Sequence, residues 1–91
     1  MSLKNTSGVL GFQQITGISA STALTVPDTA TYAIIHCTTQ ATRWRDDGTA
    51  PTGTVGMVLA AGGELRYDGN LKAIRFIESA VGAILNVSYY N

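Results

Sequence analysis

The chain has 91 residues, with six Lys or Arg against six Asp or Glu, and therefore no formal net charge at pH 7. This length predicts one domain with a small core, and the charge balance argues against nucleic acid or an anionic membrane as a partner. Ten of the twelve charged residues lie between Arg43 and Glu78, so residues 1–42 carry only Lys4 and Asp28. Such a charge-poor region is either covered by a neighbouring subunit or part of a small Thr-rich domain, and composition leaves both readings open.

The cysteine content and the hydropathy of the sequence indicate in which cellular compartment we expect the protein. Cys37 is the single cysteine, which excludes an internal disulfide and a thiol-based zinc site and is typical of a reducing compartment. No apolar run approaches the roughly 20 residues of a membrane-spanning helix, and no secretory signal segment opens the sequence. We therefore expect no membrane partner and no secretion through a signal peptide.

Residues 1–8 have turn chemistry and little to bury, so we expect a flexible N-terminal arm followed by one domain over residues 9–91. Alternating apolar and β-branched residues then predict short strands separated by Gly, Pro and Asp turns. The strands are expected at residues 9–15, 22–26, 31–38, 42–45, 54–60, 64–67, 71–78 and 83–90. Residues 31–38 are apolar on both faces, which indicates a central strand or one covered by a partner.

Asp68-Gly69-Asn70 has the composition of a tight hairpin turn between two of these strands. Seven or eight short strands at spacings of about 8–12 residues, without an apolar pattern at helical spacing, predict an all-β fold. We expect a compact antiparallel β-sandwich, of which a jelly roll is one form, in preference to a closed barrel.

His36 is the only histidine, and it stands within a predicted strand. Its neighbour Cys37 points to the opposite face of that strand, so the two side chains cannot easily converge on one metal ion. We interpret His36 as a hydrogen-bonded structural residue, within or between subunits, and expect no metal and no cofactor.

One turn concentrates charge beside the only tryptophan, and its candidate binding residues are Arg43, Trp44, Arg45, Asp46 and Asp47. Paired carboxylates suit acid–base chemistry or a weak cation site, but the ligand spacing of a helical calcium loop is missing. The favoured interpretation is that the two Asp side chains cap the turn and pair with Arg43 or Arg45. Trp44 is either an anchor of the core or of a subunit interface, or a platform on which a sugar stacks.

Three segments carry a recognisable pattern: Arg43-Trp44-Arg45-Asp46-Asp47-Gly48-Thr49-Ala50-Pro51-Thr52, Val55-Gly56-Met57 and the closing Leu85-Asn86-Val87-Ser88-Tyr89-Tyr90. A strand ends in an arginine, aromatic and Asp-Asp-Gly turn, a Pro-Thr loop follows, and an alternating aliphatic strand continues. In this pattern, residues 26–91 resemble small structural proteins of tailed phages and prophages.

The resemblance implies a virion-associated β-domain, similar to head-decoration proteins, that works as a symmetric homo-oligomer and has no catalytic residues. Its expected partners are itself, as a dimer or trimer, and other virion proteins, and its expected location is the virion or the host cytoplasm during assembly. The alternative is a small carbohydrate- or surface-binding module that uses the Arg43–Asp47 turn. An enzyme is less favoured, because no nucleophile and base can be paired.

Overall fold

The computed structural model describes residues 8–91, so the predicted arm lies outside the described residues except for Gly8. These residues contain no helix that could cross a membrane. The chain forms eight strands, which are β1 (Val9–Ile15), β2 (Thr22–Ala23), β3 (Tyr32–Thr38), β4 (Thr42–Arg45), β5 (Met57–Leu59), β6 (Glu64–Tyr67), β7 (Arg75–Glu78) and β8 (Ile84–Tyr90).

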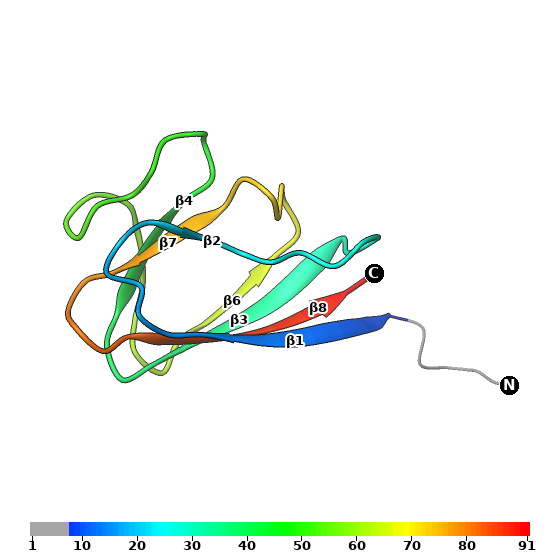
Figure 1. The fold of residues 1–91 in the computed structure, drawn as a ribbon, viewed down its shortest axis with the longest axis horizontal. Helices are drawn as coiled ribbons and strands as arrows, with labels where there is room; N and C mark the ends of the chain where they lie inside the picture. Colours follow the sequence, from blue (N-terminus) through cyan, green and yellow to red (C-terminus); the bar gives the residue numbers. More distant parts are fainter. Residues whose placement is uncertain (1–7) are drawn as a thin grey trace, which may run out of the picture.

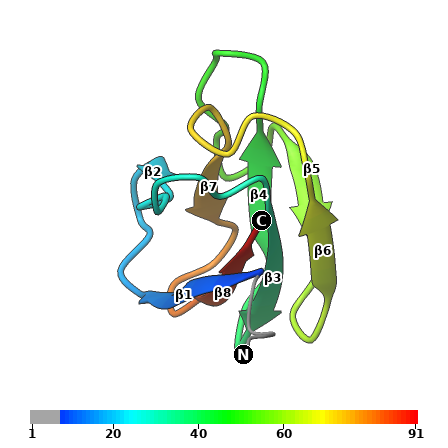
Figure 2. The same ribbon diagram turned by 90° about the vertical axis from the view of Figure 1, so that its right-hand side faces the viewer.

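The strands pair as they would in one long hairpin whose two arms each contain four strands, so that the first strand pairs with the last. The partners are β1 with β8, β2 with β7, β3 with β6 and β4 with β5, all antiparallel. Two further pairs, β3 with β8 and β4 with β7, join them into sheet A, in the order β1-β8-β3-β6, and sheet B, in the order β2-β7-β4-β5. The two sheets face each other (Figures 1 and 2). A hairpin of eight strands rolled up in this way is a jelly roll, and the predicted all-β sandwich is confirmed.

Alternation along the strands fills the space between the sheets with apolar side chains. In sheet A, Ile35 and Val87 stand opposite each other on neighbouring strands and are fully buried. In sheet B, Phe76 stands opposite Trp44 and is also fully buried. Tyr89 of β8, which stands opposite Gly11 of β1, belongs to the same core, with only 1% of its surface exposed. The interior of the jelly roll is therefore a packed core.

The predicted hairpin at Asp68-Gly69-Asn70 is wrong, because β6 belongs to sheet A and β7 to sheet B. Asn70 instead organises a turn between the sheets. Its side-chain oxygen accepts the N–H of Lys72 at 3.1 Å, and its carbonyl accepts the N–H of Ala73 at 3.0 Å. These local bonds use the backbone N–H groups at the start of the predicted strand 71–78, so only Arg75–Glu78 pairs with other strands, as β7.

Two more predicted strands are shorter in the structure for the same kind of reason. The strand expected at 22–26 ends at Ala23, and the N–H of Thr25 donates to the Gln13 side chain at 3.2 Å. The strand expected at 54–60 is reduced to Met57–Leu59. There the Thr52 hydroxyl accepts the N–H of Val55 at 3.0 Å, which closes a turn before β5.

Candidate functional site

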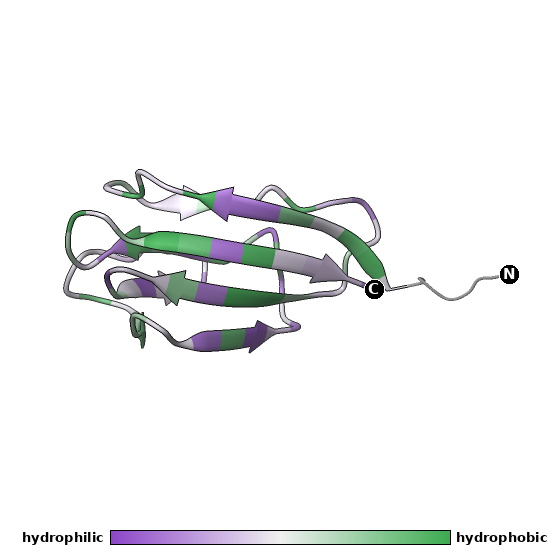
Figure 3. Cartoon of the chain, turned by 90° about the horizontal axis from the view of Figure 1, so that it is seen from below, coloured by the Kyte–Doolittle hydropathy of each residue, from purple (hydrophilic) through white to green (hydrophobic). Residues whose placement is uncertain are grey.

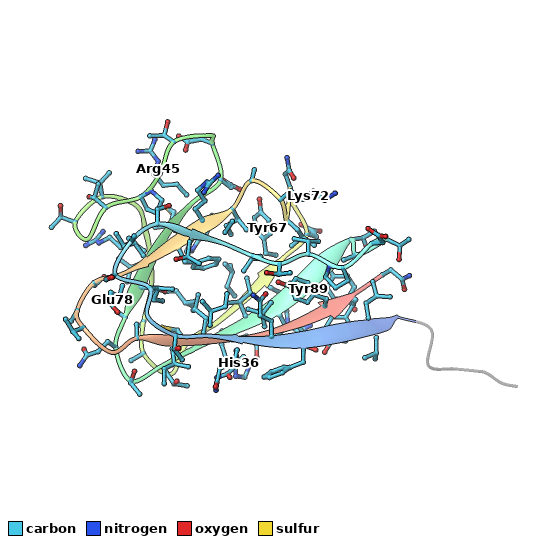
Figure 4. The ribbon with its side chains drawn as sticks, in the orientation of Figure 1. His36, Arg45, Tyr67, Lys72, Glu78 and Tyr89 are labelled. Atoms are coloured by element: carbon cyan, nitrogen blue, oxygen red, sulfur yellow. The ribbon has the colours of Figure 1, made fainter. Side chains whose placement is uncertain are left out.

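Strand β4 directs Thr42 and Trp44 toward the core and Arg43 and Arg45 outward, as the alternation predicts. Trp44 is half-buried and meets Tyr67 edge to face, with ring centroids 6.0 Å apart. Because Trp44 lies in sheet B and Tyr67 in sheet A, this contact joins the two sheets. Figure 4 shows Tyr67 between them. Trp44 thus packs against the core as an anchor, and only part of its side chain stays exposed.

Asp46 is held by the same cluster. Its carboxylate accepts a hydrogen bond from the Tyr67 hydroxyl at 2.7 Å. Burial of Tyr67 and then the nearby Asp46 carboxylate raise the pKa of this phenol to about 12. Asp46 therefore binds across to sheet A, which differs from the predicted pairing with an arginine.

Asp47 does pair with an arginine, as predicted. Arg45 donates Nε to Oδ1 at 3.0 Å and Nη2 to Oδ2 at 2.5 Å, a two-point contact between guanidinium and carboxylate. This hydrogen bonding lowers the pKa of Asp47 and raises the pKa of Arg45. Asp47 also accepts the N–H of Thr49 at 3.3 Å, so it caps the turn. The two neighbouring carboxylates are thus committed to different partners.

The loop after β4 folds back on this strand. Arg43 donates Nη1 to the carbonyl of Gly56 at 3.0 Å, while its Nε is buried and has no hydrogen-bond partner among residues 8–91. A hollow of about 410 Å³ opens beside the loop and is lined by Arg45, Asp46, Asp47, Val55, Gly56 and Met57. Arg45, the last residue of β4, lies where this projecting loop begins (Figure 4). The hollow offers an apolar wall and an ion pair to a small polar ligand, but no aromatic ring.

A second candidate is the outer face of sheet A, which looks away from sheet B. The register aligns its side chains in rows across the four strands, and Figure 3 views the sheet from this side. One row contains Phe12, Ser88 and Ile34, and Phe12 is 68% exposed. Next to it, Tyr32 and Tyr90 stack with ring centroids 5.0 Å apart and planes inclined by 16°. The part of this face on β1, β8 and β3 is therefore mostly apolar and aromatic, and Arg66 completes the row of Phe12 and Ile34 on β6.

A polar row borders this part of the face, which forms its apolar centre. Gln14 donates to the Asn86 side chain at 3.0 Å, and His36 shares a hydrogen bond of 2.8 Å with Glu64. Arg66 donates Nε to the second oxygen of Glu64 at 3.0 Å. The hydrogen bond from His36, followed by that from Arg66, lowers the pKa of Glu64. His36 is hydrogen-bonded within the chain, as predicted, and lies on the underside of the sandwich in Figure 4.

No family model, curated protein sequence or solved structure matches this chain. Within residues 8–91, no three His, Cys, Asp or Glu side chains lie close enough together to hold a metal ion. The sequence patterns singled out the Arg43–Asp47 turn and missed the outer face of sheet A. The signal for that face was the apolar character of both sides of residues 31–38, which contribute Tyr32 and Ile34.

Proposed function

We propose that this chain is a structural or accessory protein of phage or prophage virions that acts as a symmetric homo-oligomer. The observation that carries the proposal is the exposed apolar centre on the outer face of sheet A. The interior of the jelly roll is filled by core side chains, so recognition takes place on its outside. Contiguous apolar surface bordered by polar residues is typical of a protein–protein contact.

The architecture is compatible with this role. Jelly rolls build viral capsid domains as well as lectins and other binding proteins, so the fold alone does not select one function. The resemblance of residues 26–91 to phage structural modules favours the virion. A shell repeats one contact many times, and symmetric association is the usual way to do so.

The alternative, a carbohydrate-binding module at the Arg43–Asp47 turn, has less support. A sugar-binding surface relies on an exposed aromatic ring, and Trp44 is packed against the core and Tyr67. Of the charged groups of the adjoining hollow, Arg45 and Asp47 are already bonded to each other, and Asp46 is bonded to Tyr67. A ligand would have to break that pair before it could use either group.

The test is to look for the chain in particles. Virions released by a host that carries this gene are banded in a density gradient, and the proteins of the band are identified by mass spectrometry. We expect peptides of this chain in the same band as the major capsid protein, and genes for capsid, portal or tail proteins beside its own. Complete particles without the chain, from a lysate in which it stays soluble, would overturn the proposal.

A further inference from the structure

We infer that the outer face of sheet A binds a second copy of this chain, face to face across a two-fold axis. The inference rests on the proposed function and names the surface that the self-association would use. Four features of the described residues support it. They are a projecting side chain beside a hollow, a border of hydrogen-bonded polar side chains, balanced charge, and an area suited to a weak contact.

The projection and the hollow lie on the same face. A hollow of about 300 Å³ is lined by Phe12, Ile34, His36, Glu64, Asn86, Ser88 and Tyr90. Phe12 stands at its border, on the edge strand β1, with 68% of its surface exposed. A two-fold axis would place the Phe12 ring of each copy over the hollow of the other, and the exposed 68% of this side chain could bury about 100–170 Å² there. The face is thus shaped to receive its own copy.

The polar side chains of the border lose few hydrogen bonds to water when a second copy covers them. Gln14 donates a hydrogen bond to Asn86, and the Glu64 carboxylate is hydrogen-bonded to both His36 and Arg66 of the same chain. Polar groups that already have partners lose fewer bonds to water when a second surface covers them. The border therefore tolerates burial beside the apolar centre.

The balance of charge distinguishes this face from the opposite one. On the outer face of sheet A, Glu64 stands between His36 and Arg66, so two copies meet without strong repulsion. On the outer face of sheet B, the register sets Arg45 beside Arg75, and Arg43 lies on the same side of β4. Asp47 compensates the charge of Arg45, but Arg43 and Arg75 would meet the same two arginines of a second copy, which disfavours association through sheet B.

The available area predicts the strength of the contact. Three strands of seven residues and one of four, spaced about 4.8 Å apart at about 3.3 Å per residue, project an area of roughly 400 Å². Stable complexes bury about 800 Å² of accessible surface per partner, so a face of this size belongs with the smaller and weaker contacts. We therefore expect a dimer with a dissociation constant of about 1–100 µM, which is strengthened where many copies are held on one particle.

The experiment is sedimentation velocity of the full chain at concentrations from about 1 to 300 µM, chosen to span that range. Phe12→Glu is compared with two controls that add the same charge at exposed apolar positions, Val81→Glu (87% exposed) and Met57→Glu (60% exposed). We expect wild type and both controls to dimerise, and Phe12→Glu to raise the dissociation constant at least about tenfold. Circular dichroism and thermal unfolding of Phe12→Glu verify that it is folded, and Phe12→Ala serves as a milder variant.

The other outcomes separate this inference from the proposed function. If Phe12→Glu dimerises like wild type and Met57→Glu does not, the surface is wrong and the homo-oligomer stands. If wild type is monomeric but binds particles in a Phe12-dependent way, another virion protein occupies the face, and the inference of a second copy is overturned. A monomer that binds no particles contradicts both.

Discussion

Two buried tyrosines tie the loops of the sandwich to its core. The Tyr67 hydroxyl donates to Asp46 at 2.7 Å, and the Tyr89 hydroxyl donates to the side-chain oxygen of Gln13 at 2.6 Å. The same Gln13 side chain also holds Thr25 through two hydrogen bonds. A buried hydroxyl that loses its partner costs about 1–3 kcal/mol, so these bonds fix the segments that carry Asp46 and Thr25.

These tyrosines predict a loss of stability at alkaline pH. Burial raises the pKa of both Tyr67 and Tyr89 to about 12, whereas a phenol in the unfolded chain titrates near 10. Between those values the folded chain keeps protons that the unfolded chain releases, so the free energy of unfolding falls as pH rises above about 10. The loss approaches about 2–3 kcal/mol for each tyrosine by pH 12. Urea unfolding followed by the fluorescence of Trp44, at pH 8 and pH 11, measures it.

The tyrosine variants isolate the cause. Tyr67→Phe loses its bond to Asp46 and is less stable than wild type by about 1–2 kcal/mol at pH 8. Tyr67→Phe and Tyr89→Phe are each expected to lose less stability between pH 8 and pH 11 than wild type, and the double variant least of all. If the double variant declines as steeply as wild type, other groups cause the alkaline loss.

At the scale of elements, the loop between β4 and β5 is shaped by Gly56. Its φ of +142° is rarely adopted by residues with a side chain, and a Cβ there would lie 3.1 Å from the Trp44 carbonyl oxygen and 3.3 Å from Cβ of Pro51. We expect Gly56→Ala to lower the free energy of unfolding by about 1–3 kcal/mol.

Gly48 in the same loop is the matched control. It also has a positive φ, of +88°, but a Cβ there would meet nothing within 4 Å. Gly48→Ala therefore costs only the backbone strain, about 1 kcal/mol. Urea unfolding of both variants gives the comparison, and equal losses would show that the packing of Gly56 against β4 is unimportant.

The sequence predicted strands well wherever alternation alone determines them. The predicted ranges 42–45 and 64–67 coincide with β4 and β6, whose inward residues include Thr42 and Tyr67. Prediction failed where a side chain bonds the backbone locally, as Asn70 and Thr52 do at the starts of predicted strands. It also failed where partners are far apart in sequence, because a rolled hairpin sends β6 to β3 instead of to β7.

The candidate turn site was predicted only in part. Charge and spacing were sufficient to predict that the two Asp side chains pair with Arg43 or Arg45, and the structure pairs Asp47 with Arg45. They could not indicate that Asp46 would reach Tyr67, because that contact depends on how the two sheets pack. The same packing decides that Trp44 faces the core.

At the scale of the whole molecule, the uneven charge of the sequence has a structural counterpart. Residues 1–42 carry only Lys4 and Asp28, and they supply β1 and β3, two of the four strands of sheet A. From these strands Phe12, Tyr32 and Ile34 reach the outer face, and His36 is the one basic side chain that β1 and β3 contribute. The charge-poor region thus forms much of the surface to which we assign self-association.

Self-association through this face is tested by nuclear magnetic resonance of a mixture of isotope-labelled and unlabelled chains. Filtered experiments then detect only contacts between different copies. We predict intermolecular signals that connect the Phe12 ring of one copy with Ile34 and Tyr90 of the other. Intermolecular signals confined to Val55, Met57 and Val58, or none at concentrations near 1 mM, about tenfold above the weakest expected dissociation constant, would contradict the account.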